Sequence, residues 1–168
     1  QAAESREINV VLADAARGLR RFSSEIEACV EFVARADLLQ AKARLVTEDG
    51  YVVPKVMDGG RMRLRGARHP LLLQMHDRED IVPLDIALGD PHHLVVVTGP
   101  NTGGKTVVLK TVGLLSLMAI SGVPIPADAG AEIPFLRSVH ADIGDDQAIA
   151  QNLSTFSSHV QRIARCVD

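Results

Sequence analysis

The sequence predicts an α/β fold in which a strand, a glycine-rich loop and a helix follow one another, with a long helical segment before them. The aliphatic run 93–98 is typical of a buried strand, the loop follows at 99–106, and the apolar run 107–120 is typical of a helix. At the N-terminus, apolar residues recur in steps of four and three, a helical period. We therefore expect a helical segment over residues 1–48 and an α/β domain over residues 49–168.

The N-terminal segment has the apolar seam of a coiled-coil helix. The seam consists of Ile8, Leu12, Ala15, Leu19, Phe22, Ile26, Cys29, Val33 and Ala36. Gly18 and Ser23–Ser24 weaken it without changing its phase, which favours one helix from Glu4 to Leu45, straight or bent at the serines. Such a helix would be roughly 60 Å long, and its N-terminal half would need a partner or a second copy to pack on. Alternatively, a capping box of Ser24 with Glu27 starts a second helix, and the two belong to a small bundle.

Turn residues between Val46 and Gly60 mark the boundary of the second domain. The segment 61–65 then alternates strictly between arginine and apolar residues, which predicts a strand with its arginines on one face. Those arginines either neutralise phosphates of a nucleic acid or protect an edge strand from aggregation, and we favour the edge strand. A further strand is expected over Ile81–Leu88.

Beyond the apolar helix, Pro124 and Pro126 predict a tight connection, and Leu136–Ala141 is expected to form another strand. An acidic loop follows, in which Asp145 and Asp146 are either Mg²⁺ ligands or, as we favour, solvated or capping carboxylates. Ser154 is a suitable N-cap for a last helix.

The loop after the first buried run fits the phosphate-binding pattern G-x-x-x-x-G-K-[ST] at every position. Its residues are Gly99, Pro100, Asn101, Thr102, Gly103, Gly104, Lys105 and Thr106. The glycines allow several backbone N–H groups to point at one anion, Lys105 brings an ammonium to the β- and γ-phosphates, and Thr106 offers a hydroxyl to Mg²⁺. The following helix directs the positive end of its dipole at the phosphates. The pattern therefore predicts binding of a nucleoside triphosphate.

Composition sets limits on partners and compartment. A net charge of −3 gives no general attraction to nucleic acid, so such binding would use a local patch. Two widely separated cysteines match no metal or redox spacing and suit a reducing compartment. The most apolar stretch, 107–120, is too short to span a bilayer, and the N-terminus does not have the pattern of a signal peptide. We expect a soluble cytoplasmic protein without a membrane partner.

These motifs together resemble the MutS ATPases. In that family Pro-Asn follows the first glycine of the loop and two glycines precede the lysine, as at 99–106 of this sequence. Arg68-His69-Pro70 lies upstream, and Val123-Pro124-Ile125-Pro126-Ala127, Asp145-Asp146 and Ser154-Thr155-Phe156 follow in the family's order. Thr102, Thr106 and the segment 37–44 look more like the bacterial MutS-two branch than the mismatch-repair branch. The resemblance covers nearly the whole chain.

The resemblance implies a dimeric motor whose P-loop domains are of the ABC type and hold two nucleotides, ATP or ADP, between subunits. The N-terminal helix would be the end of the lever that joins the ATPase to a clamp. Asn101 to Thr106 would cradle the phosphates, Thr106 would hold Mg²⁺, and Ile81 and Val82 would pack on the adenine. Ser154 and Thr155 would reach the γ-phosphate of the partner subunit. Partners would be a second copy and either branched or duplex DNA or the ribosome and its rRNA, bound outside this chain, in recombination control or ribosome rescue.

One departure limits the activity expected of this chain. P-loop ATPases use an acidic pair at the end of an apolar strand to order Mg²⁺ and the attacking water. No such pair follows Thr106, and the nearest candidate, Ser138–Asp142, has a polar centre and no second acid. We therefore expect a fragment of an ATPase domain that binds nucleotide but hydrolyses it poorly. Two other interpretations are an SMC-like or other P-loop ATPase and a helical dimerisation module without catalysis.

Overall fold

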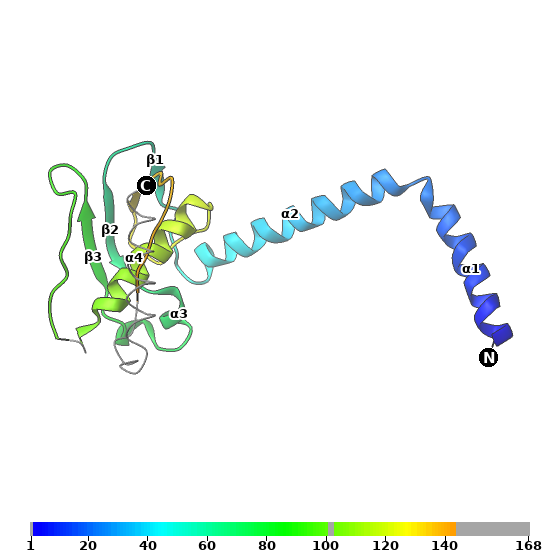
Figure 1. Ribbon diagram of the computed structural model, residues 1–168, viewed down its shortest axis with the longest axis horizontal. Helices are drawn as coiled ribbons and strands as arrows, with labels where there is room; N and C mark the ends of the chain where they lie inside the picture. Colours follow the sequence, from blue (N-terminus) through cyan, green and yellow to red (C-terminus); the bar gives the residue numbers. More distant parts are fainter. Residues whose placement is uncertain (1, 101–102, 144–168) are drawn as a thin grey trace, which may run out of the picture. The chain divides into compact units, whose positions relative to one another are not determined.

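The computed structural model describes residues 2–100 and 103–143, and the chain divides into two units between Arg44 and Leu45. Its elements are shown in Figure 1. They are α1 (Ala2–Arg20), α2 (Ser23–Thr47), β1 (Lys55–Met57), β2 (Met62–Ala67), α3 (Pro70–Leu73), the 3₁₀ turn η1 (Arg78–Asp80), β3 (Leu84–Leu88), α4 (Lys105–Ile120) and β4 (Glu132–Pro134).

The N-terminal unit contains two helices, so the expectation of one helix from Glu4 to Leu45 is wrong in its continuity. The helices are separated by Arg21 and Phe22, directly before the serines that weaken the pattern. The Phe22 N–H donates to the Leu19 carbonyl at 2.9 Å, and the Arg21 guanidinium lies 4.7 Å from the centre of the Phe22 ring. Ser24 lies inside the first turn of α2, where its hydroxyl donates to the Glu25 carboxylate at 2.9 Å.

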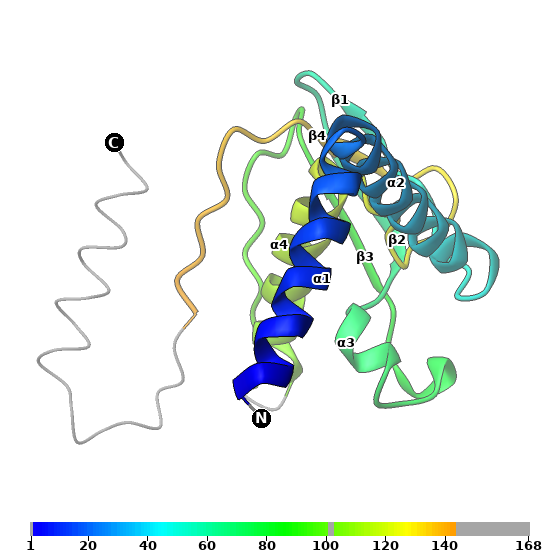
Figure 2. The ribbon, with the colours of Figure 1, turned by 90° about the vertical axis from the view of Figure 1, so that its right-hand side faces the viewer.

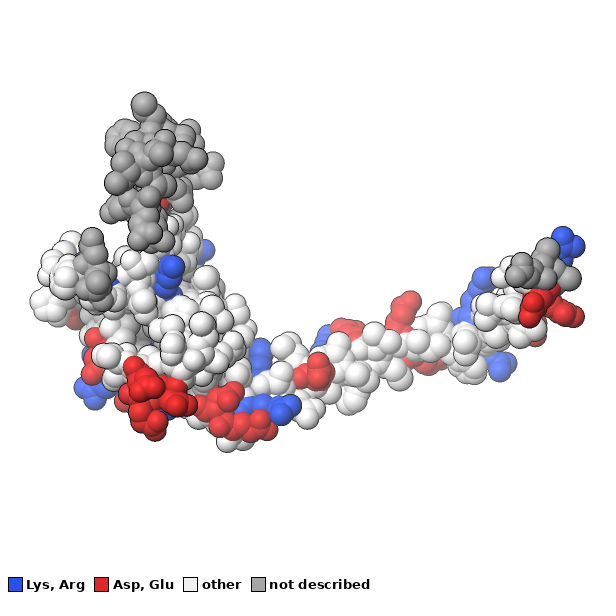
Figure 3. Space-filling model, turned by 90° about the horizontal axis from the view of Figure 1, so that it is seen from below, with Lys and Arg blue, Asp and Glu red and all other residues white. Residues whose placement is uncertain are grey.

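The side chains of α1 and α2 are exposed from Glu4 onward, except for the half-buried Lys42 and Leu45. The small-bundle alternative is therefore wrong for the described residues, because neither helix buries an apolar face. In Figure 3 the surface of the two helices is largely uncharged, with acidic and basic side chains scattered along it. No helix in the described part of the chain is long and apolar enough to cross a membrane.

The second unit is built on a four-stranded sheet in the order β1-β4-β2-β3. β1 and β4 run parallel with Lys55 opposite Glu132, and β2 is antiparallel to both of its neighbours. β2 and β3 lie side by side in Figures 1 and 2. The alternating segment predicted at 61–65 is thus confirmed as a strand, but the edge-strand interpretation is wrong, since β2 is paired on both sides.

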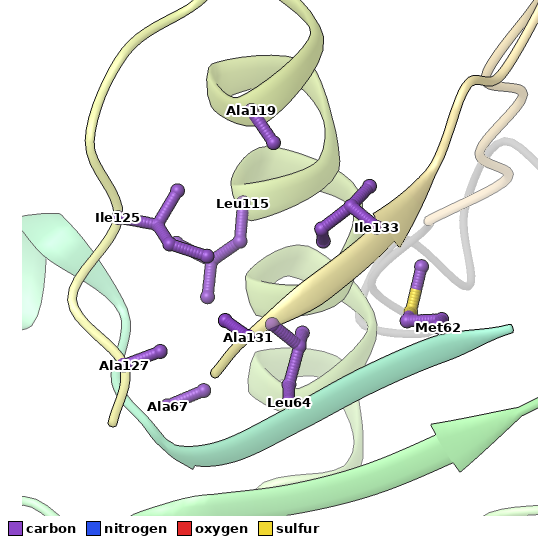
Figure 4. Packing of buried hydrophobic residues seen from close by; sticks show 9 residues of the cluster. All are labelled: Met62, Leu64, Ala67, Leu115, Ala119, Ile125, Ala127, Ala131 and Ile133. Carbon is purple, nitrogen blue, oxygen red and sulfur yellow. The ribbon is translucent and has the colours of Figure 1, made fainter. Parts of the chain in front are cut away.

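Helix α4 packs on one face of this sheet and completes the core (Figure 4). Leu64 of β2, Ile133 of β4 and Leu115 of α4 are fully buried. The connection 123–127 also enters the core, where Ile125 is fully buried and exchanges two 2.8 Å backbone hydrogen bonds with Val52. The two prolines predict the turn, but they do not predict the burial of this segment.

Two predicted strands are absent from the described structure. Residues 93–98 form no ladder, and Leu94 and Val96 are 80% and 73% exposed, so the buried strand expected there is wrong. Residues 136–141 are likewise irregular, and the strand of that region is β4, which ends at Pro134. A strand needs a hydrogen-bonded neighbour, and the described sheet offers none to either segment.

Candidate nucleotide-binding site

The glycine-rich loop leads directly into α4. Gly104 is the N-cap residue and has φ 76° and ψ 12°, a left-handed conformation that costs a residue with a Cβ atom about 1–2 kcal/mol. The Gly103 N–H donates to the Pro100 carbonyl at 3.0 Å, which closes a tight turn before the helix. The predicted ligands Asn101 and Thr102 lie outside the described residues.

Lys105 folds back over its own loop. Its ammonium nitrogen donates to the carbonyl oxygens of Gly99 at 2.6 Å and Pro100 at 2.8 Å. These carbonyls are neutral acceptors, and hydrogen bonds to charged acceptors are roughly twice as strong. The arrangement therefore holds the cation at the mouth of the loop, where a phosphate can compete for it.

The first turn of α4 provides the remaining phosphate-binding features. Its early backbone N–H groups have no acceptor within the helix, and the helix dipole favours an anion at this end. Thr106, the predicted Mg²⁺ ligand, lies in this turn and is exposed. No carboxylate lies in the first turn to compete with a phosphate.

A cavity of about 590 Å³ adjoins the loop, within the range of small-molecule sites. It is lined by Gly103, Gly104, the α4 residues Val107, Val108 and Thr111, the segment Asp80–Leu84, and Ala67–His69, Leu72 and His76. The cavity therefore brings Ile81 and Val82, which the family resemblance assigns to adenine, next to the phosphate loop. Ile81 is buried, whereas Val82 is 87% exposed.

Arg68 and His69 form part of the wall, a position that the sequence did not predict. The Arg68 backbone N–H donates to the Pro126 carbonyl at 2.9 Å, and its Nη1 donates to the Gly66 carbonyl at 3.0 Å. Burial and the charge of Lys110 lower the pKa of the His69 imidazole below its ordinary value, so the ring is neutral at pH 7. The only signal for this wall was the Arg-His-Pro motif, whose chemistry spacing alone does not reveal.

The described residues contain no group of three His, Cys, Asp or Glu side chains arranged for a metal. Asp142, in the nearest candidate for an acidic strand end, is exposed in an irregular segment. The other candidates, Asp145, Asp146, Ser154 and Thr155, lie outside the described residues.

Comparison with known proteins finds similarity to the family that the sequence motifs resemble. Residues 95–168 match the family described as MutS domain V. Proteins named Endonuclease MutS2 are similar over nearly the whole chain: 47% identical over 97% of it in Thermomicrobium roseum, 46% over 96% in Lactobacillus helveticus, and 40% over 98% in Clostridium botulinum. The chain spans 20–22% of the length of these relatives.

Proposed function

Because this chain belongs to the MutS family and carries sequence of its P-loop ATPase domain, we propose that it binds ATP and ADP with Mg²⁺ through residues Gly99–Thr106. The observation that supports this most directly is the geometry of Lys105, whose ammonium lies against two loop carbonyls at the N-terminus of α4. In the proposal the loop and the helix N-terminus hold the phosphates. The adjoining cavity, with Ile81 and Val82, holds the adenine.

Magnesium would be held by the nucleotide phosphates and the Thr106 hydroxyl. Bound Mg²⁺ supplies charge neutralisation at the β- and γ-phosphates. In this sequence no acidic pair at the end of an apolar strand follows Thr106, which supports poor hydrolysis by this chain. We propose that efficient turnover requires strands contributed by the remainder of a longer protein. That protein would pair the exposed segment 93–98 into its sheet, and this chain would be one part of the ATPase domain.

In that longer protein we propose a homodimer in which α1 and α2 form the end of a lever between ATPase and clamp. The exposure of both helices supports a role in contacts beyond this chain. Ser154 and Thr155 would reach the γ-phosphate bound by the partner subunit. The relatives are named as endonucleases, which supports a nucleic-acid substrate, either branched or duplex DNA in recombination control or rRNA in ribosome rescue.

A second candidate function is a helical dimerisation module without catalysis. The observation that favours it is the exposed apolar surface of α1 and α2, including Ile8, Leu12, Leu19, Ile26 and Val33. It accounts for the helices but not for the phosphate loop.

Calorimetric titration of the chain with MgATP and MgADP tests the nucleotide proposal. We expect saturable binding, weakened about 10- to 100-fold by Lys105→Ala, because a hydrogen-bonded charge contributes about 1.5–3 kcal/mol. Lys110→Ala is the matched control, since it removes the same charge farther along α4, and its affinity should stay within about twofold of wild type. Equal affinities of the wild type and Lys105→Ala would contradict the proposal.

A further inference from the structure

One wall of the cavity beside the phosphate loop is polar, and the proposed phosphate binding does not involve it. His69 and Arg68 contribute it, directly before helix α3, and both side chains are half-buried. Two of their nitrogens, His69 Nδ1 and Arg68 Nε, are buried without a hydrogen-bond partner among the described residues. Buried polar atoms are nearly always paired, so each of these nitrogens needs an explanation. Because a nitrogen without accessible surface cannot meet a ligand, the His69 nitrogen available to a ligand in the cavity is Nε2.

Arg68 has a structural explanation. Its backbone N–H and Nη1 are bonded to Pro126 and Gly66, so the guanidinium joins strand β2 to the connection that enters the core. No comparable bond in the described structure involves the His69 ring. The backbone carbonyl of His69 instead accepts from Leu72 N–H at 3.0 Å, which fixes the residue at the start of α3 and leaves the ring to the cavity wall.

The charge state of His69 indicates which part of a nucleotide suits it. Burial and Lys110 disfavour the protonated ring, so at pH 7 it presents one N–H donor and one nitrogen acceptor. A phosphate group would be matched by a cation, as Lys105 supplies. The accessible nitrogen of a neutral ring matches instead the neutral donors and acceptors of a nucleoside.

The other lining residues also divide into a side that suits a nucleoside and a side that borders the phosphate loop. Ile81, Val82 and Pro83 provide an apolar surface in the same cavity, while Gly103 and Gly104 border it on the side of the phosphate loop. Ligand sites typically combine apolar walls with a few placed polar groups that set orientation. We propose that His69 is a nucleoside-binding residue, which hydrogen-bonds the nucleoside half of the nucleotide while the loop holds the phosphates. This inference rests on the proposed nucleotide-binding function.

Two variants separate hydrogen bonding from packing at this position. His69→Phe keeps a flat ring but removes both nitrogens, whereas His69→Gln keeps a polar group near the position of Nε2. His92→Phe, at an exposed histidine outside the cavity lining, is the matched control. Each form of the chain is titrated with MgADP and, separately, with inorganic tripolyphosphate, which has phosphates but no nucleoside.

We expect His69→Phe to bind MgADP about five- to tenfold more weakly, the loss of one hydrogen bond, while its tripolyphosphate affinity is unchanged. His69→Gln should recover part of the MgADP affinity, and His92→Phe should match wild type. Without ligand, the melting temperature of His69→Phe should not fall, because an apolar ring replaces an unpaired buried nitrogen. If His69 had a purely structural role, His69→Phe would lower the melting temperature and reduce the affinities for MgADP and tripolyphosphate equally.

The outcomes also separate this inference from the proposed function. If wild type binds both ligands and His69→Phe binds MgADP with wild-type affinity, the role of His69 is refuted and the phosphate loop stands. A loss of both ligands in His69→Phe likewise refutes it in favour of a structural role. If wild type binds neither ligand, the nucleotide site itself is absent and both proposals fail.

Discussion

Gly66 lies where strand β2 departs from regular pairing, two residues before Arg68. The register of β2 against β3 shifts between Leu64 and Ala67, and Gly66 within this irregularity has φ 58°. Its N–H donates to the Asp85 carboxylate at 2.7 Å, and the Arg68 guanidinium bonds its carbonyl. Gly66 therefore lies at the irregularity of β2 that directly precedes the two polar residues of the cavity wall, Arg68 and His69.

Gly66→Ala is expected to destabilise the fold by about 2–4 kcal/mol. A Cβ atom there would carry the strain of a left-handed backbone, about 1–2 kcal/mol, and would lie 2.5–2.6 Å from the carboxylate atoms of Asp128. Gly50→Ala is the control, because Gly50 has φ 66° with open space around its Cβ position and reports the backbone strain alone. Urea unfolding measures both; equal losses would mean that the Asp128 side chain moves away at no cost.

At the scale of elements, α4 performs two tasks along its length. Its N-terminus follows the phosphate loop. Farther along the helix, Leu115 and Ala119 belong to the core cluster that includes residues of β2 and β4, and Thr111 is also buried. Because the same rigid helix connects the loop to the core, the packing of its middle turns holds the loop in place against β2 and β4.

Leu115→Ala should lower the free energy of unfolding by about 3 kcal/mol, since Leu115 is fully buried and its truncation leaves a cavity. Leu117→Ala, on the same helix but 46% exposed, should cost less than about 1 kcal/mol. Denaturant titration of the pair tests whether α4 is anchored through the face seen in Figure 4. Similar costs for the two substitutions would contradict that packing.

Elements with local causes were predictable from the sequence, and elements that depend on distant partners were not. The α4 helix follows from its apolar run and β2 from its alternation. The break before Ser23 lies beside weak helix formers, but their strength did not reveal that the helix stops there. By contrast, β1 and β4 are three residues each and are strands because they pair with each other. The run 93–98 has strand composition but no neighbour among the described strands, so composition alone misled us.

The candidate site divides in the same way. The phosphate loop is a continuous motif, so its residues could be named from the sequence. The cavity wall is assembled from three separate segments, around His69, Ile81 and Val107, and their meeting depends on the sheet. Sequence spacing could not reveal that His69 lies in the same cavity as Ile81.

At the scale of the whole molecule, the apolar seam of α1 and α2 is exposed along the described part of both helices. If a second copy covers it, the chain should dimerise in sedimentation equilibrium. The double variant Ile26→Lys/Val33→Lys, on the seam, should then be monomeric, because buried lysines are costly. Val30→Lys, at a residue as exposed as Val33 but off the seam, is the control and should dimerise as wild type. A wild-type monomer at all concentrations would assign the seam to another partner.

The parallel pairing of β1 with β4 also has a consequence for synthesis. Lys55 leaves the ribosome long before Glu132, its partner in the sheet. At about 5–20 residues per second, roughly 4–15 s separate the two. During that interval α1 and α2 can already form, whereas β2 and the apolar side of α4 have no completed core to enter. The nascent chain is therefore most exposed to aggregation and to chaperones after β1 has been translated and before β4 has followed.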